Sequence, residues 1–264
     1  MKIAAIQTNV GSDIQANIED LEKKIREAAN NGAEFIATPE NSDFILSPTS
    51  EKIAVCPIEG EHPLVPAIQA LCSELKVRVL IGSISVKQNS GKMRNRSYLI
   101  SHEGEIIAQY DKNHLFDVSL PNGEGYKESE YYEAGEKLVL ADTHIAKIGL
   151  SICYDVRFPN MYRQYAKNGA QILTVPSAFT VPTGEAHWES LLRARAIENG
   201  AYVIAPAQTG EHHGGRKTYG HSLIIDPWGK ILADAGKDVG IIYADIDLTK
   251  VEEVRQSIPS LQGN

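Results

Sequence analysis

Short apolar segments with strand-like composition alternate with amphipathic segments along most of the chain. Ile14, Ile18, Leu21 and Ile25 recur at steps of three and four residues, which places them on one face of a helix. We expect helices at residues 14–28, 64–76, 159–168 and 185–199, and strands at residues 3–6, 33–40, 77–85, 147–153, 172–176 and 201–207. This alternation is typical of layered α/β folds. Two expected hairpins, at residues 97–112 and 222–247, predict a mixed sheet or two sheets.

The length of 264 residues permits one large domain or two small ones. We expect a single domain over residues 1–264, because no linker, repeat or low-complexity segment divides the chain. The formal net charge of −8, with no block of like charges, argues against nucleic acid or an anionic membrane as partner. No apolar run approaches the roughly 20 residues that span a bilayer. The start of the chain shows no signal-peptide pattern, and the three cysteines are too few for a disulfide framework, so we expect a cytoplasmic protein.

Three reactive side chains stand at the carboxyl ends of expected strands: Glu40, Lys112 and Cys153. Ligand sites of open α/β sheets lie beyond these ends, so the three groups can converge. Taken singly, each has a simpler explanation, since a strand-end Glu or Lys is usually solvated and a lone buried cysteine usually packs as a small apolar side chain. Taken together they suit one mechanism. The thiol needs a base, which Glu40 supplies, and Lys112 can stabilise the thiolate and a developing oxyanion.

The sequence around these residues resembles the carbon–nitrogen hydrolase (nitrilase) superfamily from residue 1 to about residue 258. The motifs that carry the resemblance are Thr38-Pro39-Glu40-Asn41, Tyr110-Asp111-Lys112-Asn113-His114-Leu115-Phe116 and Ser151-Ile152-Cys153-Tyr154-Asp155-Val156-Arg157-Phe158-Pro159. The resemblance implies a four-layer α-β-β-α sandwich with mixed sheets. It also implies assembly into a homodimer or a larger homo-oligomer.

The resemblance further implies a Glu-Lys-Cys triad that works without a metal or an organic cofactor. Glu40 would be the general base, Lys112 the oxyanion stabiliser and proton donor, and Cys153 the nucleophile that forms a thioester. A second glutamate of the family matches Glu128, which would position the substrate and hold Lys112. Glu124 and Glu130 fit that position less well.

The second half of the chain contains Ser177-Ala178-Phe179-Thr180-Val181-Pro182-Thr183-Gly184, Ala186-His187-Trp188-Glu189 and Gln208-Thr209-Gly210-Glu211-His212-His213. On these motifs it most resembles the family branch that hydrolyses deaminated glutathione to 2-oxoglutarate and cysteinylglycine. The alternative is an ω-amidase that acts on α-ketoglutaramate or another small aliphatic amide. Both substrates are small molecules with an α-keto carboxylate. Arg157 is expected to bind that carboxylate, although an ion pair with Asp155 or another acid explains it equally simply. Tyr154 would supply an oxyanion N–H, and Phe179 and Thr183 would contact the keto acid.

Several other residues have more than one interpretation from the sequence alone. His212, His213 and Arg216 are candidates for contact with the peptide tail of such a substrate, or are exposed polar residues of a loop. A metal site at His212, His213 and His221 is disfavoured, because no HExxH or comparable carboxylate pattern accompanies them. Residues 114–136 form a long segment without regular pattern, of the kind that serves as a lid or an interface. A non-catalytic member of the same fold is the alternative from another functional class.

Overall fold

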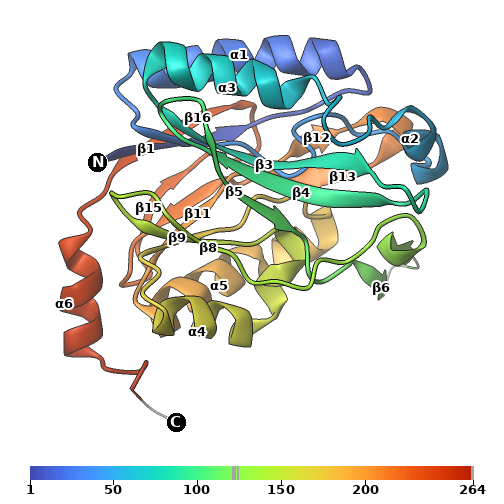
Figure 1. Cartoon of the computed structure of the whole chain (residues 1–264). Coiled ribbons are helices and arrows are strands. Elements are labelled where there is room, and N and C mark those ends of the chain that lie inside the picture. The colour runs from blue at the N-terminus through green and yellow to red at the C-terminus, as the bar shows by residue number, and fades with distance from the viewer. Residues whose placement is uncertain (121–122, 124, 263–264) are drawn as a thin grey trace.

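Two six-stranded mixed sheets pack face to face in the computed structural model, which describes residues 1–120, 123 and 125–262 (Figure 1). The first sheet has the order β16 (Gly240–Asp245), β1 (Lys2–Gln7), β2 (Phe35–Ala37), β3 (Arg78–Lys87), β4 (Met93–Ile100) and β5 (Ile106–Asp111). The second has the order β15 (Ile231–Asp234), β14 (Leu223–Ile225), β11 (Tyr202–Ala205), β10 (Ile172–Thr174), β9 (Lys147–Leu150) and β8 (Leu140–Asp142).

The two sheets share one plan. In each, three parallel strands lie in the middle, β1, β2 and β3 in the first sheet and β9, β10 and β11 in the second. Antiparallel strands extend both sides of each parallel group. The parallel strands are covered on both faces, which explains why their sequences are almost continuously apolar.

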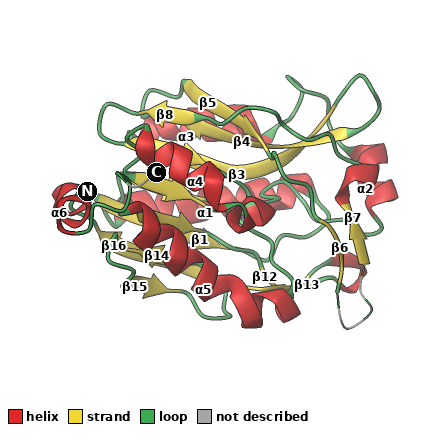
Figure 2. Cartoon of the chain, turned by 90° about the horizontal axis from the view of Figure 1, so that it is seen from below, coloured by secondary structure: helices red, strands yellow, loops and turns green. Residues whose placement is uncertain are grey.

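Helices cover the outer face of each sheet. The first sheet carries α1 (Ile14–Asn30) and α3 (Leu64–Leu75), whose apolar faces join a core cluster with β1, β2 and β3. The second sheet carries α4 (Pro159–Lys167) and α5 (Val181–Asn199), as seen from below in Figure 2. Helix α6 (Thr249–Ser257) lies at the side of the layers (Figure 1). The order of layers is therefore helix, sheet, sheet, helix.

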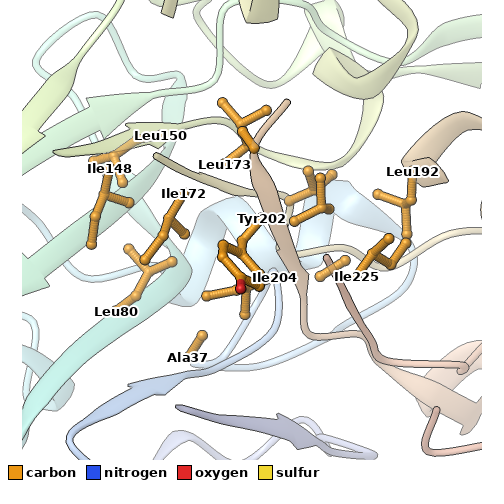
Figure 3. Packing of buried hydrophobic residues seen from close by; sticks show 14 of the residues in the cluster. Ala37, Leu80, Ile148, Leu150, Ile172, Leu173, Leu192, Tyr202, Ile204 and Ile225 are labelled. Atoms are coloured by element: carbon orange, nitrogen blue, oxygen red, sulfur yellow. The ribbon is translucent and has the colours of Figure 1, made fainter. Parts of the chain in front are cut away.

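A second core fills the space between the sheets. Ala37 and Leu80 of the first sheet face Ile172 and Ile204 of the second, and all four are fully buried (Figure 3). Burial of apolar area in these two cores provides the main stabilisation, about 25 cal/mol for each Å² removed from water.

The segments that follow the strands gather at the end of the molecule away from both termini. Helix α2 (Thr49–Val55), the pair β6 (Asp117–Ser119) and β7 (Gly125–Lys127), and the pair β12 (Thr209–Glu211) and β13 (Lys217–Tyr219) all lie there (Figures 1 and 2). Across the described residues, no helix is both long and apolar enough to cross a bilayer.

The main expected helices and strands are present, with corrections at their ends. Helix α5 begins at Val181 rather than Glu185, because Pro182 fits the first turn of a helix. Strand β9 ends at Leu150, and Cys153 opens the short 3₁₀ helix η2 (Cys153–Arg157). Residues 114–136 contain β6, β7 and the 3₁₀ helix η1 (Glu128–Glu130). Helix α2 and the β12–β13 pair were not expected, because they are short and carry no clear periodicity.

The two sheets approach each other closely at Gly82 of β3. A Cβ at this position would overlap the Thr38 carbonyl and lie 2.5 Å from both the Pro39 carbonyl and the Pro176 side chain. Pro39 precedes Glu40, and the Pro176 carbonyl accepts the Cys153 N–H. The absence of a side chain at Gly82 therefore lets the segments that carry Glu40 and Cys153 meet.

We predict that Gly82→Ala lowers the free energy of unfolding by about 1–3 kcal/mol, because the added methyl has no space. Denaturant unfolding measures this. Gly240→Ala is the matched control, since a Cβ on that strand glycine meets nothing within 4 Å. Equal stability of the two variants would contradict the proposed close approach.

Candidate active site

Glu40 lies three residues beyond β2, where its side chain is almost completely buried. One carboxylate oxygen, Oε1, accepts hydrogen bonds from Asn95 Nδ2 at 2.8 Å and Lys112 Nζ at 3.1 Å. The other, Oε2, accepts the Ala178 N–H at 2.8 Å. The thiol of Cys153 lies close enough for the thiol and the carboxylate to shift each other's pKa. The carboxylate is thus fixed between segments that follow β2, β5, β9 and β10.

Lys112 follows β5 directly and is 2% exposed. Besides Glu40, its ammonium donates to both oxygens of Glu128, at 3.1 Å and 2.9 Å. Glu128 in turn accepts the Phe116 N–H at 2.6 Å. Residues 114–136 therefore bring the second carboxylate to the lysine, and Lys112 is shared between two acids.

Cys153 has a backbone φ of +49°, in the left-handed region that non-glycine residues rarely adopt. Its N–H donates to the Pro176 carbonyl at 2.9 Å. Strained conformations of this kind persist only where the surroundings fix them, and they are frequent at functional sites. Here the conformation places the thiol beside Glu40 instead of continuing the strand.

Asp155 ties the Lys112 segment to the Cys153 segment. Its fully buried carboxylate accepts hydrogen bonds from the Tyr110 hydroxyl at 2.7 Å, the His114 N–H at 3.0 Å and the Ile152 N–H at 2.9 Å. Sequence reasoning considered Asp155 only as a partner of Arg157 and missed this role. Asn95 was also missed, because it precedes the expected hairpin at residues 97–112 and a single polar residue there gives no distinguishing signal.

The charges of the cluster reinforce one another. Burial raises the pKa of Glu40, but the Lys112 ammonium, the Cys153 thiol and the Arg216 charge together outweigh burial and hold this pKa below its usual value. Burial opposes the charged form of Lys112 as well, and the charges of Glu128 and Glu40 nevertheless raise its pKa well above the usual range. Burial and then the Glu40 charge raise the pKa of Cys153. In the resting cluster Glu40 and Lys112 are therefore held in their charged forms beside a protonated thiol.

The cluster opens into a cavity of about 540 Å³. Of the expected substrate-binding residues, Tyr154, Phe179 and Thr183 line this cavity and Arg157 does not. The Arg157 guanidinium lies 5.5 Å from the Phe179 ring centre, 5.9 Å from the Tyr154 ring centre and 3.3 Å from Nδ1 of His187. Arg157 is thus behind the aromatic wall, and Asp155 is occupied by other partners.

The loop residues divide in the same way. His212 is buried and bonded to the Val10 carbonyl at 3.0 Å and the Thr218 hydroxyl at 2.7 Å, and it does not line the cavity. His213 is exposed and does not line the cavity, whereas Arg216 does.

Glu130 lies 3.7 Å from Lys127, and Glu124 lies outside the described residues. Within residues 1–120, 123 and 125–262, no group of three or more His, Cys, Asp or Glu side chains is arranged to hold a metal ion.

Comparison with known proteins identifies the family. The profile of the carbon-nitrogen hydrolases matches residues 2–256. The chain belongs to the carbon-nitrogen hydrolase family. A Synechocystis protein named deaminated glutathione amidase is 43% identical over 267 residues, covering 98% of this chain and 96% of its own. A protein of the same name from Yersinia enterocolitica is 36% identical over 265 residues, covering 99% of this chain and 92% of its own.

The fold comparison agrees. The crystal structure of the C. elegans NitFhit protein matches with a TM-score of 0.93 and 38% identity, and it covers 100% of this chain. The present chain spans 64% of that protein. The four-layer α-β-β-α sandwich is therefore confirmed. As a carbon-nitrogen hydrolase, the chain is an enzyme that acts on carbon–nitrogen bonds other than peptide bonds, and a small-molecule amide fits it as substrate.

The charge cluster makes a prediction about pH. Glu40, the expected base, can accept a proton only when it is ionised. Its pKa is held below the usual value of 4.5, so kcat/KM falls only at lower pH. Lys112 loses its charge only above 10.5, because its pKa is raised. We expect a flat kcat/KM profile between about pH 6 and pH 9. In Glu128→Gln the alkaline limb moves to lower pH, because Lys112 loses one of the charges that raise its pKa.

A pH–rate series on both enzymes makes this measurement. The matched control is Glu136→Gln, which removes an exposed carboxylate near the end of the same segment. Superimposable profiles for wild type and Glu128→Gln would show that Glu128 does not act on Lys112.

Proposed function

We propose that this protein is a cysteine-dependent amidase that hydrolyses deaminated glutathione to 2-oxoglutarate and cysteinylglycine through a thioester acyl-enzyme. One observation carries the proposal: the Cys153 thiol, the Glu40 carboxylate and the Lys112 ammonium share one buried cluster at the wall of the cavity. The mechanism that we propose for these groups uses no metal or organic cofactor.

Acylation begins when Glu40 accepts the thiol proton and Cys153 Sγ attacks the amide carbon. The oxygen that becomes negative is stabilised by Lys112 Nζ and the Tyr154 N–H. The carbon–nitrogen bond then breaks, and the leaving amine takes the proton from Glu40. Removal of the proton during attack suits a thiol whose pKa burial and Glu40 hold high.

Deacylation repeats the proton transfers with water. Glu40 accepts a proton as water attacks the thioester carbon, Lys112 again stabilises the oxyanion, and Sγ leaves and is reprotonated by Glu40. Splitting one difficult amide hydrolysis into two steps is the general benefit of nucleophilic catalysis. Glu128 positions the ammonium in both steps, since it holds Lys112 from the other side.

The choice of substrate rests on the relatives and on the cavity. Two relatives that match nearly the full chain carry the name deaminated glutathione amidase. The cavity of about 540 Å³ is within the range of sites that enclose ligands of this size. Phe179 and Thr183 are proposed to contact the keto-acid half, because both line the cavity near Cys153. The alternative is α-ketoglutaramate, which presents the same keto-acid half.

We predict that kcat/KM for release of 2-oxoglutarate is at least about 10-fold higher with deaminated glutathione than with α-ketoglutaramate, because the longer substrate makes further contacts. Cys153→Ala is expected to lose at least about 10⁴-fold on both. Cys72→Ala is the matched control, because that cysteine is buried in α3 among apolar side chains. A preference for α-ketoglutaramate would replace the proposed substrate and keep the nucleophile, whereas an active Cys153→Ala would refute the nucleophile.

We further propose that the chain forms a single domain over residues 1–264, works in the cytoplasm and assembles as a homodimer or larger homo-oligomer. Trp228 and Ile197, which are 61% and 48% exposed, support an apolar contact surface on the outer side of α5. We predict that Trp228→Glu lowers the mass measured by light scattering toward that of one chain. An unchanged assembly, or a wild type that is already a single chain, would contradict this surface as the interface.

A further inference from the structure

Four cationic side chains line the cavity: Lys52, Lys112, Lys127 and Arg216. Two of them are fully engaged within the protein. Lys112 lies between its two carboxylates. Lys52 is 4% exposed and donates to Asn41 Oδ1 at 2.8 Å and to the Phe44 carbonyl at 3.0 Å. Neither is available to a ligand without losing bonds to buried groups.

The two remaining cations differ in their partners. Lys127 faces Glu130 at 3.7 Å, and both side chains are largely in solvent. Arg216 is only partly exposed, and among the described residues no carboxylate lies within 4.0 Å of its guanidinium nitrogens. The guanidinium is near enough to Glu40 for its charge to lower the pKa of that carboxyl, but within the described part of the chain it forms no close ion pair.

The hydrogen bonds of Arg216 leave donors unused. Nη2 donates to the Ala178 carbonyl at 3.1 Å, and Nε is buried without a partner. A guanidinium has five N–H groups, four of them on Nη1 and Nη2. Apart from the bond to Ala178, those four have no acceptor among the described residues. Two parallel N–H groups on an arginine are the usual partner of a carboxylate.

The other described cations of the cavity wall each have a carboxylate of the protein close by. Lys112 lies between Glu40 and Glu128, Lys127 lies beside Glu130, and the charge of Lys52 is compensated by the buried Asp43. Arg216 differs from them, because no described carboxylate lies within ion-pair distance of it.

Arg216 is close to the reacting groups. Ala178 donates its N–H to Glu40 Oε2 and accepts Arg216 Nη2 on its carbonyl, so one residue separates the base from the guanidinium. The loop that carries Arg216 is held in place at Gly214, where φ is +78° and a Cβ would lie 2.6 Å from the Ser47 side chain. A guanidinium fixed in this way loses little freedom when it binds a ligand.

We propose that Arg216 binds a carboxylate of the amide substrate and so selects anionic over neutral amides. This inference rests on the proposed function for its substrate, which has a carboxylate in its keto-acid half and another on its glycine. Both groups share the chemistry that Arg216 recognises. Arg157 is not an equivalent site, because it does not line the cavity.

The test is the steady-state kinetics of Arg216→Met on four amides: deaminated glutathione, the same compound with its glycine carboxylate converted to an amide, α-ketoglutaramate and propionamide. We expect kcat/KM for deaminated glutathione to fall about 10- to 100-fold, mainly through KM, and kcat/KM for propionamide to change less than about 2-fold. Arg216→Lys should recover part of the loss, because it keeps the charge without the paired N–H groups.

The two carboxylates are distinguished by the other arms. If kcat/KM of Arg216→Met falls with deaminated glutathione but not with its glycine-amide form or with α-ketoglutaramate, Arg216 binds the glycine carboxylate. If kcat/KM falls equally with all three anionic amides, Arg216 binds the keto-acid carboxylate. Lys217→Met is the matched control, since this neighbouring cation pairs with Glu211 at the surface and does not line the cavity.

Two results would overturn the inference: no loss on any anionic amide, or an equal loss on propionamide, which would mean that Arg216 acts through Glu40 or the fold. Failure of the proposed function looks different. In that case the wild type itself does not prefer deaminated glutathione. The ratio of kcat/KM for anionic amides to kcat/KM for propionamide, compared between wild type and Arg216→Met, still tests the role of Arg216.

Discussion

A lysine ammonium buried between two carboxylates is the interaction on which this site depends. Removing a charge from water is unfavourable unless close partners replace the solvent. Lys112 has both partners within 3.1 Å, in Glu40 and Glu128. Burial and then the negative charge of Glu40 raise the pKa of the Cys153 thiol by more than the Lys112 ammonium lowers it, so the thiol is held protonated next to an ionised carboxylate.

The fold makes this arrangement by bringing together segments that are far apart in the sequence. The segments after β2, β5, β9 and β10 leave their strands at one end of the sandwich, and the close approach at Gly82 lets the two sheets share one site. Asp155 then holds the Lys112 and Cys153 segments together through Tyr110 and Ile152. Ala178 adds a third link, because it contacts the base on one side and Arg216 on the other.

The sequence predicted the parts of this structure that depend on local periodicity or on strand ends. The helix at Ile14 and the buried strands followed from apolar spacing, and Glu40, Lys112 and Cys153 were recognised as strand-end residues that can converge. Glu128 was found only through resemblance to the family, because residues 114–136 have no periodic pattern.

The remaining features depend on tertiary contacts that periodicity does not encode. His212 and Arg216 are four residues apart in one loop, yet the first is bonded within the core and the second faces the cavity. Arg157 was expected to line the cavity. The rings of Tyr154 and Phe179 line it instead, and the Arg157 guanidinium lies next to these rings outside the cavity. Asn95 reaches Glu40 because the register of β4 against β3 turns it inward.

The central claim is that Cys153 carries the acyl group while Glu40 moves the protons. The most direct test is intact-protein mass spectrometry after Glu40→Gln is mixed with deaminated glutathione and quenched in acid, because loss of the base slows hydrolysis of any thioester that forms. The account predicts a mass increase equal to one 2-oxoglutaryl group, located on the peptide that contains Cys153 and absent when Cys153→Ala is added. An adduct on another residue, or one that survives in the double variant, would contradict it.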